Sequence, residues 1–438
     1  MSTQAIPTDH VTQTLRKIEA MISSGQYPAA AEALQQVQNA SPGDARVYLL
    51  LSRLAEANGS PKAALEAMRH AISALPGWPV AAIEMALLLS RQSQFPDAIQ
   101  QAERALQLAP GQLDYVTRAV DIAHRAQNIP QALQWLQLAT ALAPTNRLFK
   151  QLIATDLGTL GQHAESLAAF TALVESDPAD QAALFGRVQA AIANGDMKLA
   201  KLDAAALVAL APENEEYKFW QDIAKGKTPK TQPAAVVRKV FAGFADLYDQ
   251  HMVRGLRYQL PKQVAKIITD RYAAEPFNVL DLGCGTGLLG VCLGRINGAL
   301  IGVDLSEEMI AQAMRHNVYD RFHHVNLLDA LKATPKSLYH VVAACDVFNY
   351  VGDLSKAISG AYKVLVPGGS VIFSIEAAGE DEADVVLRST MRYVHKPSHV
   401  EALCQKSGFE DIALTPTVIR LENNAPVNGF LVVARKPA

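Results

Sequence analysis

A turn in the second half of the chain has the residue types and spacing of a cofactor-binding loop. The stretch VLDLGCGTGLLG, residues 279–290, holds glycines in two overlapping registers, GxGxG from Gly283 and GxGxxG from Gly285. A GxGxxG turn directly after a strand places a helix N-terminus against a pyrophosphate. In the other register Asp281 precedes the first glycine, and its carboxylate repels a pyrophosphate but attracts an amino or sulfonium cation. The acid therefore favours the GxGxG register and a cationic ligand.

A second acid lies where such folds hold a nucleoside. The run ALIGVDLS contains Asp304, 17 residues after Gly287. An acid at the tip of the second strand hydrogen-bonds ribose hydroxyls, which a dinucleotide and a cationic nucleoside cofactor both offer. The alternative is that Asp304 only caps the next helix, but Ser306 is better placed for that.

Short apolar runs and helical patterns alternate around these acids. The expected strands are FNVLDLG, ALIGVDLS, HHVNLL, HVVAACDVF and GGSVIFSIEA, the first of them ending at Leu280 with Asp281 just beyond it. The expected helices are GLLGVCLGRI, SEEMIAQAMRH and DLSKAISGAYKVL. This alternation predicts a parallel sheet with helices on both faces, in which ligands bind at the carboxyl ends of the strands.

The acid and the GxGxG turn resemble motif I of class I S-adenosylmethionine-dependent methyltransferases. LVPGGSVIFSIE resembles the family's Pro-Gly-Gly turn into the fifth strand, and TVIRLENNAPVNGFLVVARK its closing hairpin, with a turn at Asn423-Asn424. The resemblance spans about residues 237–436. It implies a Rossmann-like domain with a mostly parallel seven-stranded sheet and a C-terminal antiparallel hairpin. It also implies S-adenosyl-L-methionine as cofactor and S-adenosyl-L-homocysteine as product.

The resemblance also implies which residues hold the cofactor. They are Tyr248, Asp281, Gly283, Cys284, Gly285, Gly287, Asp304, Leu305, Met309, Asn326, Leu327 and Asp346. The family contacts adenine at the exit of the third strand. Here Asn326 occupies the usual position of an acid and Asp329 follows three residues later, so either could reach the adenine amino group.

Three segments could face the methyl acceptor. FAGFADLYDQHM carries Tyr248, which in related methyltransferases lies over the cofactor. Asp346, Asn349 and Tyr350 follow the fourth strand, where the family often handles the acceptor. After the fifth strand, Arg392 could bind an anionic acceptor and His395 could act as a base, although surface positions would explain both residues nearly as well.

A repeat of 34 residues fills the first half of the chain. Prolines occur at positions 42, 76, 110, 144, 178 and 212, and twelve residues before each lies a small residue: Ala30, Ala64, Ala98, Ala132, Ser166 or Ala200. Seventeen residues before each proline lies a turn position, occupied by Gly25, Gly59, Ser93, Gln127, Gly161 or Gly195. A proline ends a helix, a small residue lets two helices approach, and glycine suits a tight turn.

This register resembles the tetratricopeptide repeat. It predicts an all-α solenoid domain over residues 1–225, with six repeats in 11–214 and a capping helix, then a linker over 226–236 and the methyltransferase domain over 237–438. Family positions that line the concave face hold Arg53, Arg91, Asp114, Asp121, His124 and Arg125. The Lys and Asn pattern that binds a chaperone C-terminus is absent there. A groove without a ligand and a groove that docks a protein both remain open.

Composition excludes several other classes of protein. The net charge is −3 with no large basic cluster, which disfavours nucleic acid as a partner. The first residues, MSTQAIPTDHVTQTLRK, have no apolar core, so we expect no secretory signal, and no apolar run has membrane-spanning length. Four cysteines without a CxxC pair predict neither a zinc site nor a disulfide framework, so we expect no metal and a cytoplasmic location.

The leading functional prediction is methyl transfer to a small-molecule or carrier-bound acceptor, with the repeats docking a partner protein. The fourth-strand exit, CDVFNYVGDL, lacks the Pro-Pro-aromatic loop of enzymes that methylate DNA bases or glutamine amides. The alternatives are a protein methyltransferase whose groove binds its substrate, a non-catalytic adaptor with a cofactor-binding domain, and a dehydrogenase.

Overall fold

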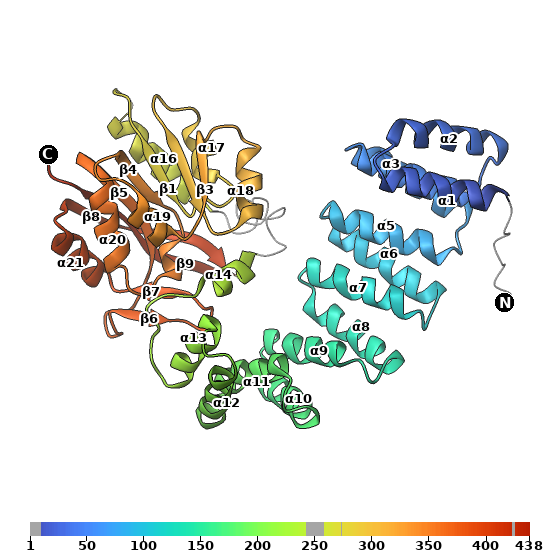
Figure 1. Ribbon diagram of the computed structural model, residues 1–438, viewed down its shortest axis with the longest axis horizontal. Coiled ribbons are helices and arrows are strands. Elements are labelled where there is room, and N and C mark those ends of the chain that lie inside the picture. The colour runs from blue at the N-terminus through green and yellow to red at the C-terminus, as the bar shows by residue number, and fades with distance from the viewer. Residues whose placement is uncertain (1–9, 242–257, 273, 423–424) are drawn as a thin grey trace. The chain divides into compact units, whose positions relative to one another are not determined.

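The computed structural model describes residues 10–241, 258–272, 274–422 and 425–438 (Figure 1). The chain divides into two compact units, one within residues 1–195 and the other within 196–438. This division falls earlier in the chain than the domain limits of 225 and 237 that we expect from the sequence.

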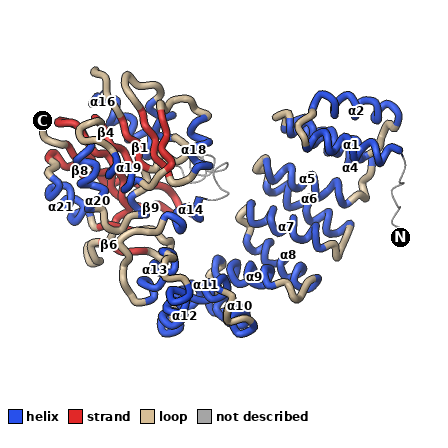
Figure 2. The backbone as a smooth tube through the Cα atoms, viewed as in Figure 1, coloured by secondary structure: helices blue, strands red, loops and turns tan. Residues whose placement is uncertain are grey.

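The first unit is built from antiparallel helix pairs, drawn as helices throughout in Figure 2. Its helices are α1 (His10–Ser23), α2 (Tyr27–Ala40), α3 (Ala45–Ala57), α4 (Pro61–Ala74), α5 (Pro79–Arg91), α6 (Phe95–Leu108), α7 (Leu113–Arg125), α8 (Ile129–Leu142), α9 (Arg147–Thr159), α10 (His163–Ser176) and α11 (Gln181–Ala193). The predicted repeat register is confirmed in its details. Each repeat proline lies two residues beyond the end of a helix, and the alanines at positions 30, 64, 98 and 132 are fully buried.

The turn within each repeat requires a left-handed backbone. Gly25 and Gly59 have φ of 76° and 70°, as the sequence predicts. Ser93 and Gln127, at the same repeat position, take φ of 60° and 54° although they carry side chains. The repeat geometry therefore imposes this conformation even where glycine is missing.

Three of the six charged residues predicted to line the groove, Arg53, Arg91 and His124, pair with neighbouring helices, and Asp114 pairs within its own helix α7. Arg53 lies between Glu19 and Glu84, and Arg91 pairs with Glu56. In addition, Asp114 pairs with Arg118, and His124 with Asp156. Many partners lie about one repeat apart in sequence, so these ion pairs link equivalent helices of successive repeats.

The second unit starts with helices and continues into a sheet. Its helices are α12 (Met197–Leu210), α13 (Glu215–Ala224), α14 (Ala234–Phe241), α16 (Leu260–Tyr272), α17 (Leu288–Leu293), α18 (Glu307–Met314), α19 (Leu327–Ala333), the 3₁₀ helix η2 (Phe348–Tyr350), α20 (Ser355–Val364) and α21 (Pro397–Ser407). Its strands are β1 (Val279–Leu282), β2 (Leu300–Asp304), β3 (Arg321–His324), β4 (Tyr339–Ala344), β5 (Leu365–Ala377), β6 (Val385–Leu387), β7 (Tyr393–His395), β8 (Glu410–Glu422) and β9 (Ala425–Arg435).

The sheet confirms the expected fold class but has nine described strands instead of seven. Strands β3, β2, β1, β4 and β5 are parallel neighbours in that order. The closing hairpin is β8 with β9, and β9 runs antiparallel to β5. The two additional strands are β6 and β7, which add to the sheet because Glu376 and Ala377 at the end of β5 pair with β7. The expected turn at Asn423-Asn424 lies outside the described residues.

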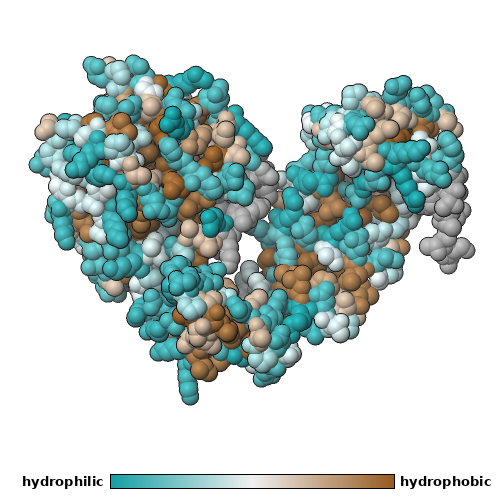
Figure 3. Space-filling model, in the orientation of Figure 1, coloured by the Kyte–Doolittle hydropathy of each residue, from teal (hydrophilic) through white to brown (hydrophobic). Residues whose placement is uncertain are grey.

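Apolar residues of both sheet faces form the core of this unit. On one face of the sheet, Phe348 and Phe373 pack with helices α20 and α21. On the other face, α16 packs against the sheet through Val264 and Ile268. Hydrophobic and hydrophilic residues are mixed on the visible face of the molecule (Figure 3). Among the described residues, no helix has the length and apolar character that a membrane span requires.

Candidate functional site

A cavity opens at the carboxyl ends of β1, β2 and β4 in the second unit. It holds about 830 Å³ of empty space, open solvent at its mouth included. Its wall comes from the turns after these strands, from the start of α19, and from residues 231–238 before and within α14. The cavity lies at the place in a parallel sheet where ligands bind.

Two glycines of the predicted turn form part of the cavity wall. Gly283 has φ of 64° and packs so closely on Val347 that a Cβ atom would lie 2.4 Å from a methyl group of that residue. Gly285 has φ of 52°, and a Cβ atom there would meet no atom within 4 Å. Its bare backbone therefore faces open space that a ligand can fill. Gly287 does not line the cavity but begins α17.

Asp304 lies at the rim of the cavity, at the end of β2. Its Oδ2 accepts a 2.8 Å hydrogen bond from the Gly285 amide, and its Oδ1 accepts one of 2.9 Å from Ser306. Burial raises the pKa of the carboxyl, and these backbone hydrogen bonds oppose that shift. Ser306 caps α18, as expected, so Asp304 is not needed as the cap. Leu305 and Met309 add apolar surface beside the acid.

The structure does not bring Asp281 to the cavity. β1 extends to Leu282, so Asp281 is a residue of the strand, and its expected position beyond the strand end was wrong. Its carboxylate is 1% exposed and accepts a 2.6 Å hydrogen bond from the hydroxyl of Tyr319, which also accepts one from the Gly290 amide. Burial raises its pKa to about 7. Cys284 is also buried away from the cavity.

The buried carboxyl of Asp281 predicts a pH-dependent stability. Because its pKa rises from 3.8 to about 7 on folding, the folded chain binds more protons than the unfolded chain between these values. Stability should therefore fall as the pH rises through this range. Asp281→Asn cannot ionise and can still accept the Tyr319 hydroxyl. We expect this variant to be at least ~1 kcal/mol more stable than the wild type at pH 8, and no more stable at pH 4. Thermal unfolding across this range measures it, and parallel profiles for the two proteins would contradict it.

The sequence left open whether Asn326 or Asp329, both after β3, lies where a cofactor could bind. Asn326 lines the cavity and caps α19, with its Oδ1 accepting a 2.8 Å hydrogen bond from the Leu328 amide. Leu327 lines the cavity beside it. Asp329 is exposed and lies at a different surface hollow. Asn326 is therefore the residue of the two that a ligand in the cavity can reach.

The exit of β4 carries a residue in an unusual conformation. Asp346 has φ of 56°, a left-handed value that costs energy for a residue with a side chain. Its amide donates a 2.8 Å hydrogen bond to the hydroxyl of Ser374, which fixes this bend. Asp346 and Tyr350 both line the cavity, whereas Asn349 lies behind them and is 1% exposed.

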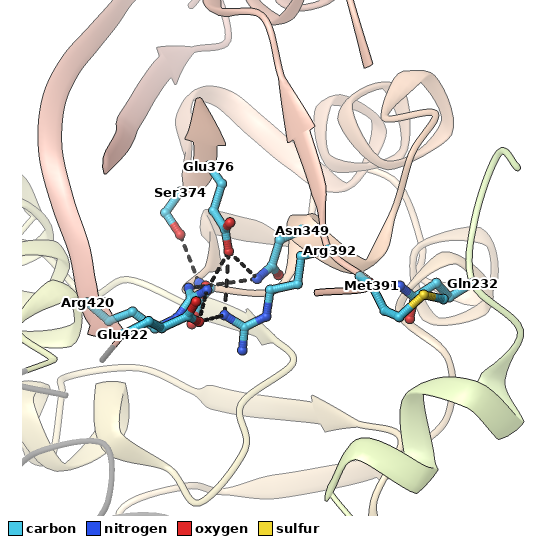
Figure 4. Close-up of polar contacts among 9 residues, drawn as sticks. Gln232, Asn349, Ser374, Glu376, Met391, Arg392, Arg420 and Glu422 are labelled. Carbon is cyan, nitrogen blue, oxygen red and sulfur yellow. Dashed lines mark hydrogen bonds and ion pairs between the residues drawn. The ribbon is translucent and has the colours of Figure 1, made fainter. Parts of the chain in front are cut away.

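A buried charge network contacts Asp346, and Figure 4 labels its members Glu376, Arg392, Arg420 and Glu422. Arg420 of β8 has a fully buried side chain, and its guanidinium donates to Asp346 at 2.8 Å, to Glu376 at 2.6 Å and to Glu422 at 2.8 Å. Asn349 donates to Asp346 and Glu376. Burial raises the pKa of Asp346 and of Glu376 to about 7. We name Asp346, Glu376, Arg392, Arg420 and Glu422 the charge network.

The other acceptor-site candidates have different surroundings. Arg392 belongs to the charge network, donates to Glu422 at 2.7 Å and lies over the Tyr350 ring at 5.9 Å. His395 does not line the cavity; its Nε2 lies 3.0 Å from the backbone oxygen of Val351, and burial lowers its pKa to about 4. Tyr248 lies outside the described residues.

Several cavity residues were not predicted from the sequence. Thr231, Gln232, Val237 and Arg238 line the cavity from a stretch that reads as a linker followed by a short helix. Nothing local in GKTPKTQPAA marks Gln232, because its position depends on contacts with residues more than a hundred positions away. Within the described chain, no group of three or more His, Cys, Asp or Glu side chains could hold a metal ion.

Comparisons with known proteins point to the same two families. A model described as "Methyltransferase domain" matches residues 279–369. Models described as "Tetratricopeptide repeat" match residues 21–88, 83–147 and 152–215. A ubiquinone biosynthesis O-methyltransferase of Hydrogenovibrio crunogenus is 30% identical over 176 residues, covering 36% of this chain and 70% of that protein. One of Psychrobacter arcticus is 28% identical over 185 residues, covering 36% and 71%.

Among solved structures, a 1,6-didemethyltoxoflavin-N1-methyltransferase of Burkholderia thailandensis shares 18% identity at a TM-score of 0.38, over 48% of this chain and 93% of that one. This likeness is too low to bear on function, and the family rests on the sequence relatives. The cavity fits the family's cofactor, because it offers a bare backbone at Gly285, an acid at Asp304 and apolar walls. The chain belongs to the S-adenosylmethionine-dependent methyltransferases, as an enzyme in which tetratricopeptide repeats precede the methyltransferase domain.

Proposed function

We propose that this enzyme methylates a hydroxyl oxygen of a small-molecule or carrier-bound acceptor, with the repeats docking a partner protein. The observation that carries the proposal is the cavity itself, whose β2 and β3 side has residues suited to the nucleoside of the donor and whose β4 side is lined by Asp346 and Tyr350. The curated relatives are O-methyltransferases by name, which supports oxygen as the acceptor atom.

The residues on the β2 and β3 side would hold S-adenosylmethionine. Gly283 and Gly285 would approach it through their backbone, and Asp304 would accept hydrogen bonds from the ribose hydroxyls. Asn326 would lie beside the adenine, whose ring would pack on apolar side chains. Those apolar side chains are Leu305, Met309 and Leu327.

The donor supplies a methyl group already activated by a sulfonium, so the protein's tasks are positioning, exclusion of water and removal of the acceptor proton. Positioning alone can lower a barrier by ~7–11 kcal/mol. Asp346 and Tyr350 line the β4 side of the cavity, where the acceptor must lie. Arg392 and Asn349 would act through these two residues and not on the acceptor directly. The buried imidazole of His395 is no base for this cavity.

The repeats support a partner-docking role, because tetratricopeptide arrays commonly bind proteins in their groove. Arg53, Arg91 and His124 pair within the array, so docking would depend on other groups of the groove. The alternative is that a protein bound by this groove is itself the methyl acceptor.

All four cysteines are free thiols, which supports a reducing compartment such as the cytoplasm.

Transfer of a tritiated methyl group from labelled S-adenosylmethionine distinguishes these two acceptors. The full-length enzyme would be incubated with the small-molecule fraction and, separately, with the protein fraction of one cell lysate. We expect tritium in organic-extractable small molecules, in a form stable to mild alkali, as a methyl ether is. Label that precipitates with protein and resists thioester cleavage would favour the protein acceptor, and label in neither fraction would contradict the proposed transfer.

A further inference from the structure

The segment before α14 is fixed to the loop that follows β4. Thr231 and Val351 form an antiparallel bridge, and the Asp353 amide donates a 2.7 Å hydrogen bond to the Lys230 oxygen. The backbone amide of Gln232 donates a hydrogen bond to the backbone oxygen of Tyr350 at 3.4 Å. Because this loop carries Tyr350, these contacts hold Gln232 beside one of the residues that line the β4 side of the cavity.

The side chain of Gln232 has one polar atom that the described protein does not satisfy. Gln232 lines the cavity but is 3% exposed, and its Nε2 donates to the backbone oxygen of Met391 (Figure 4). A carbonyl oxygen only accepts, so the amide nitrogen must be the group that faces Met391. The Oε1 is then directed elsewhere, and it has no hydrogen-bond partner among the described residues. A buried acceptor without a partner is rare in proteins and calls for a ligand, ion or water.

The position of Gln232 separates it from the proposed donor site. Asp304 and Asn326 follow β2 and β3, which lie on one side of β1, whereas the Gln232 segment is bound to the loop after β4, on the other side. Asp346 occupies this side too. The hydrogen bonds from Asn349 and Arg420 both end on its Oδ1, and its Oδ2 takes neither. On the β4 side, two residues that line the cavity thus each carry an acceptor oxygen without a bond from these groups: the buried Oε1 of Gln232 and the Oδ2 of Asp346.

We propose that Gln232 binds the methyl acceptor through its Oε1, and that Gln232 and Asp346 form a subsite for a neutral ligand with hydroxyl groups. Such a ligand donates to both oxygen atoms, while the side chains of Tyr350 and Val351 supply an apolar surface for its ring or chain. The subsite rests on the proposed function, because it places the acceptor oxygen on the side of the cavity opposite Asp304.

Catechol and its dimethyl ether test this subsite as probes. They have the same ring, but only catechol donates hydrogen bonds. Binding to the full-length protein saturated with S-adenosylhomocysteine would be measured by saturation-transfer NMR and calorimetry. We expect the wild type to bind catechol and to bind the ether about tenfold more weakly or not at all.

Three variants of the full chain separate binding from local structure. Gln232→Met keeps the length of the side chain and loses the oxygen, so catechol affinity should fall about tenfold or more. Both Gln232→Met and Gln232→Glu lose the hydrogen bond from Nε2 to Met391. Gln232→Glu keeps an acceptor oxygen, so it should retain most of the affinity for catechol. Gln405→Met, the same substitution at an exposed glutamine of α21 that does not line the cavity, is the matched control and should bind as the wild type does. The affinity for S-adenosylhomocysteine should stay within about twofold in all three.

Each other outcome has a defined meaning. Equal catechol affinity in Gln232→Met and wild type would overturn the subsite, and so would equal losses in Gln232→Met and Gln232→Glu, which would reduce Gln232 to a structural contact. A wild type that binds S-adenosylhomocysteine but not catechol would overturn it too. A wild type that does not bind S-adenosylhomocysteine would instead contradict the proposed function.

Discussion

Asp304→Ala is expected to weaken S-adenosylhomocysteine binding by at least ~100-fold, since each hydrogen bond to a charged group contributes about 1.5–3 kcal/mol. The variant removes the carboxylate at the cavity rim that would accept from the two ribose hydroxyls. It also removes the acceptor of the Gly285 amide, so the glycine turn loses the contact that holds it against β2. Both effects act on the donor site, and calorimetric titration of the full-length protein measures their sum.

The matched control is Asp329→Ala. Asp329 is an acid of the same length on α19, exposed and away from the cavity. Its removal should leave the affinity within about twofold of the wild type. Wild-type affinity in Asp304→Ala would remove Asp304 from the donor site. A large loss in Asp329→Ala would mean that Asp329, and not Asn326, recognises the adenine.

Arg420→Met is expected to lower the stability of the second unit by about 3–5 kcal/mol, which is the usual cost of removing one partner from a buried ion pair. The fully buried guanidinium is the common partner of Asp346, Glu376 and Glu422. Without it, Asp346 loses its guanidinium partner and Glu376 keeps only the more distant guanidinium of Arg392, at 3.6 Å. Both nearly buried carboxyls must then carry a poorly compensated charge or take up protons. A loss of this size should lower the melting temperature of the unit by about 6–20 °C.

The loss should depend on pH in a definite direction. The pKa of Asp346 and of Glu376 is about 7, so both carboxyls can be neutral at pH 5, where the variant leaves little unpaired charge. At pH 8 protonation costs more, and the defect should be largest. Scanning calorimetry at both pH values measures this. Arg435→Met on β9, an arginine about half exposed, is the control and should change little. A defect equal at both pH values would contradict the role of these carboxyls.

Much of the fold follows from local patterns in the sequence. The 34-residue proline spacing places the end of the second helix of each repeat, because a proline beyond the first turn cannot continue a helix. Apolar runs mark β1, β2, β4 and β5, because both faces of the sheet are covered there. The short strands β6 and β7 carry too few residues for such a pattern, and they form only because the end of β5 offers a free edge. The expected position of the third strand, HHVNLL, was wrong: β3 is the largely exposed run RFHH, and Leu327 and Leu328 begin α19.

The site was predictable where a motif is local and not where it depends on distant contacts. Gly283, Gly285 and Asp304 lie in contiguous motifs, and all three line the cavity. Arg420 lies in the strand run TVIRLE, which resembles an ordinary hairpin edge, and its partners come from separate segments of the chain. Gln232 lacks any local signal, because its position is set by the β4 loop and Met391.

The most direct test of the donor site is a calorimetric titration of the full-length protein with S-adenosylhomocysteine and, separately, with NAD. We expect one S-adenosylhomocysteine to bind per chain and NAD not to bind. In Asp304→Ala the heat signal of S-adenosylhomocysteine binding should be lost. Binding of NAD in preference to S-adenosylhomocysteine, or binding of S-adenosylhomocysteine that Asp304→Ala leaves unchanged, would contradict the assignment of this cavity as the methyl-donor site.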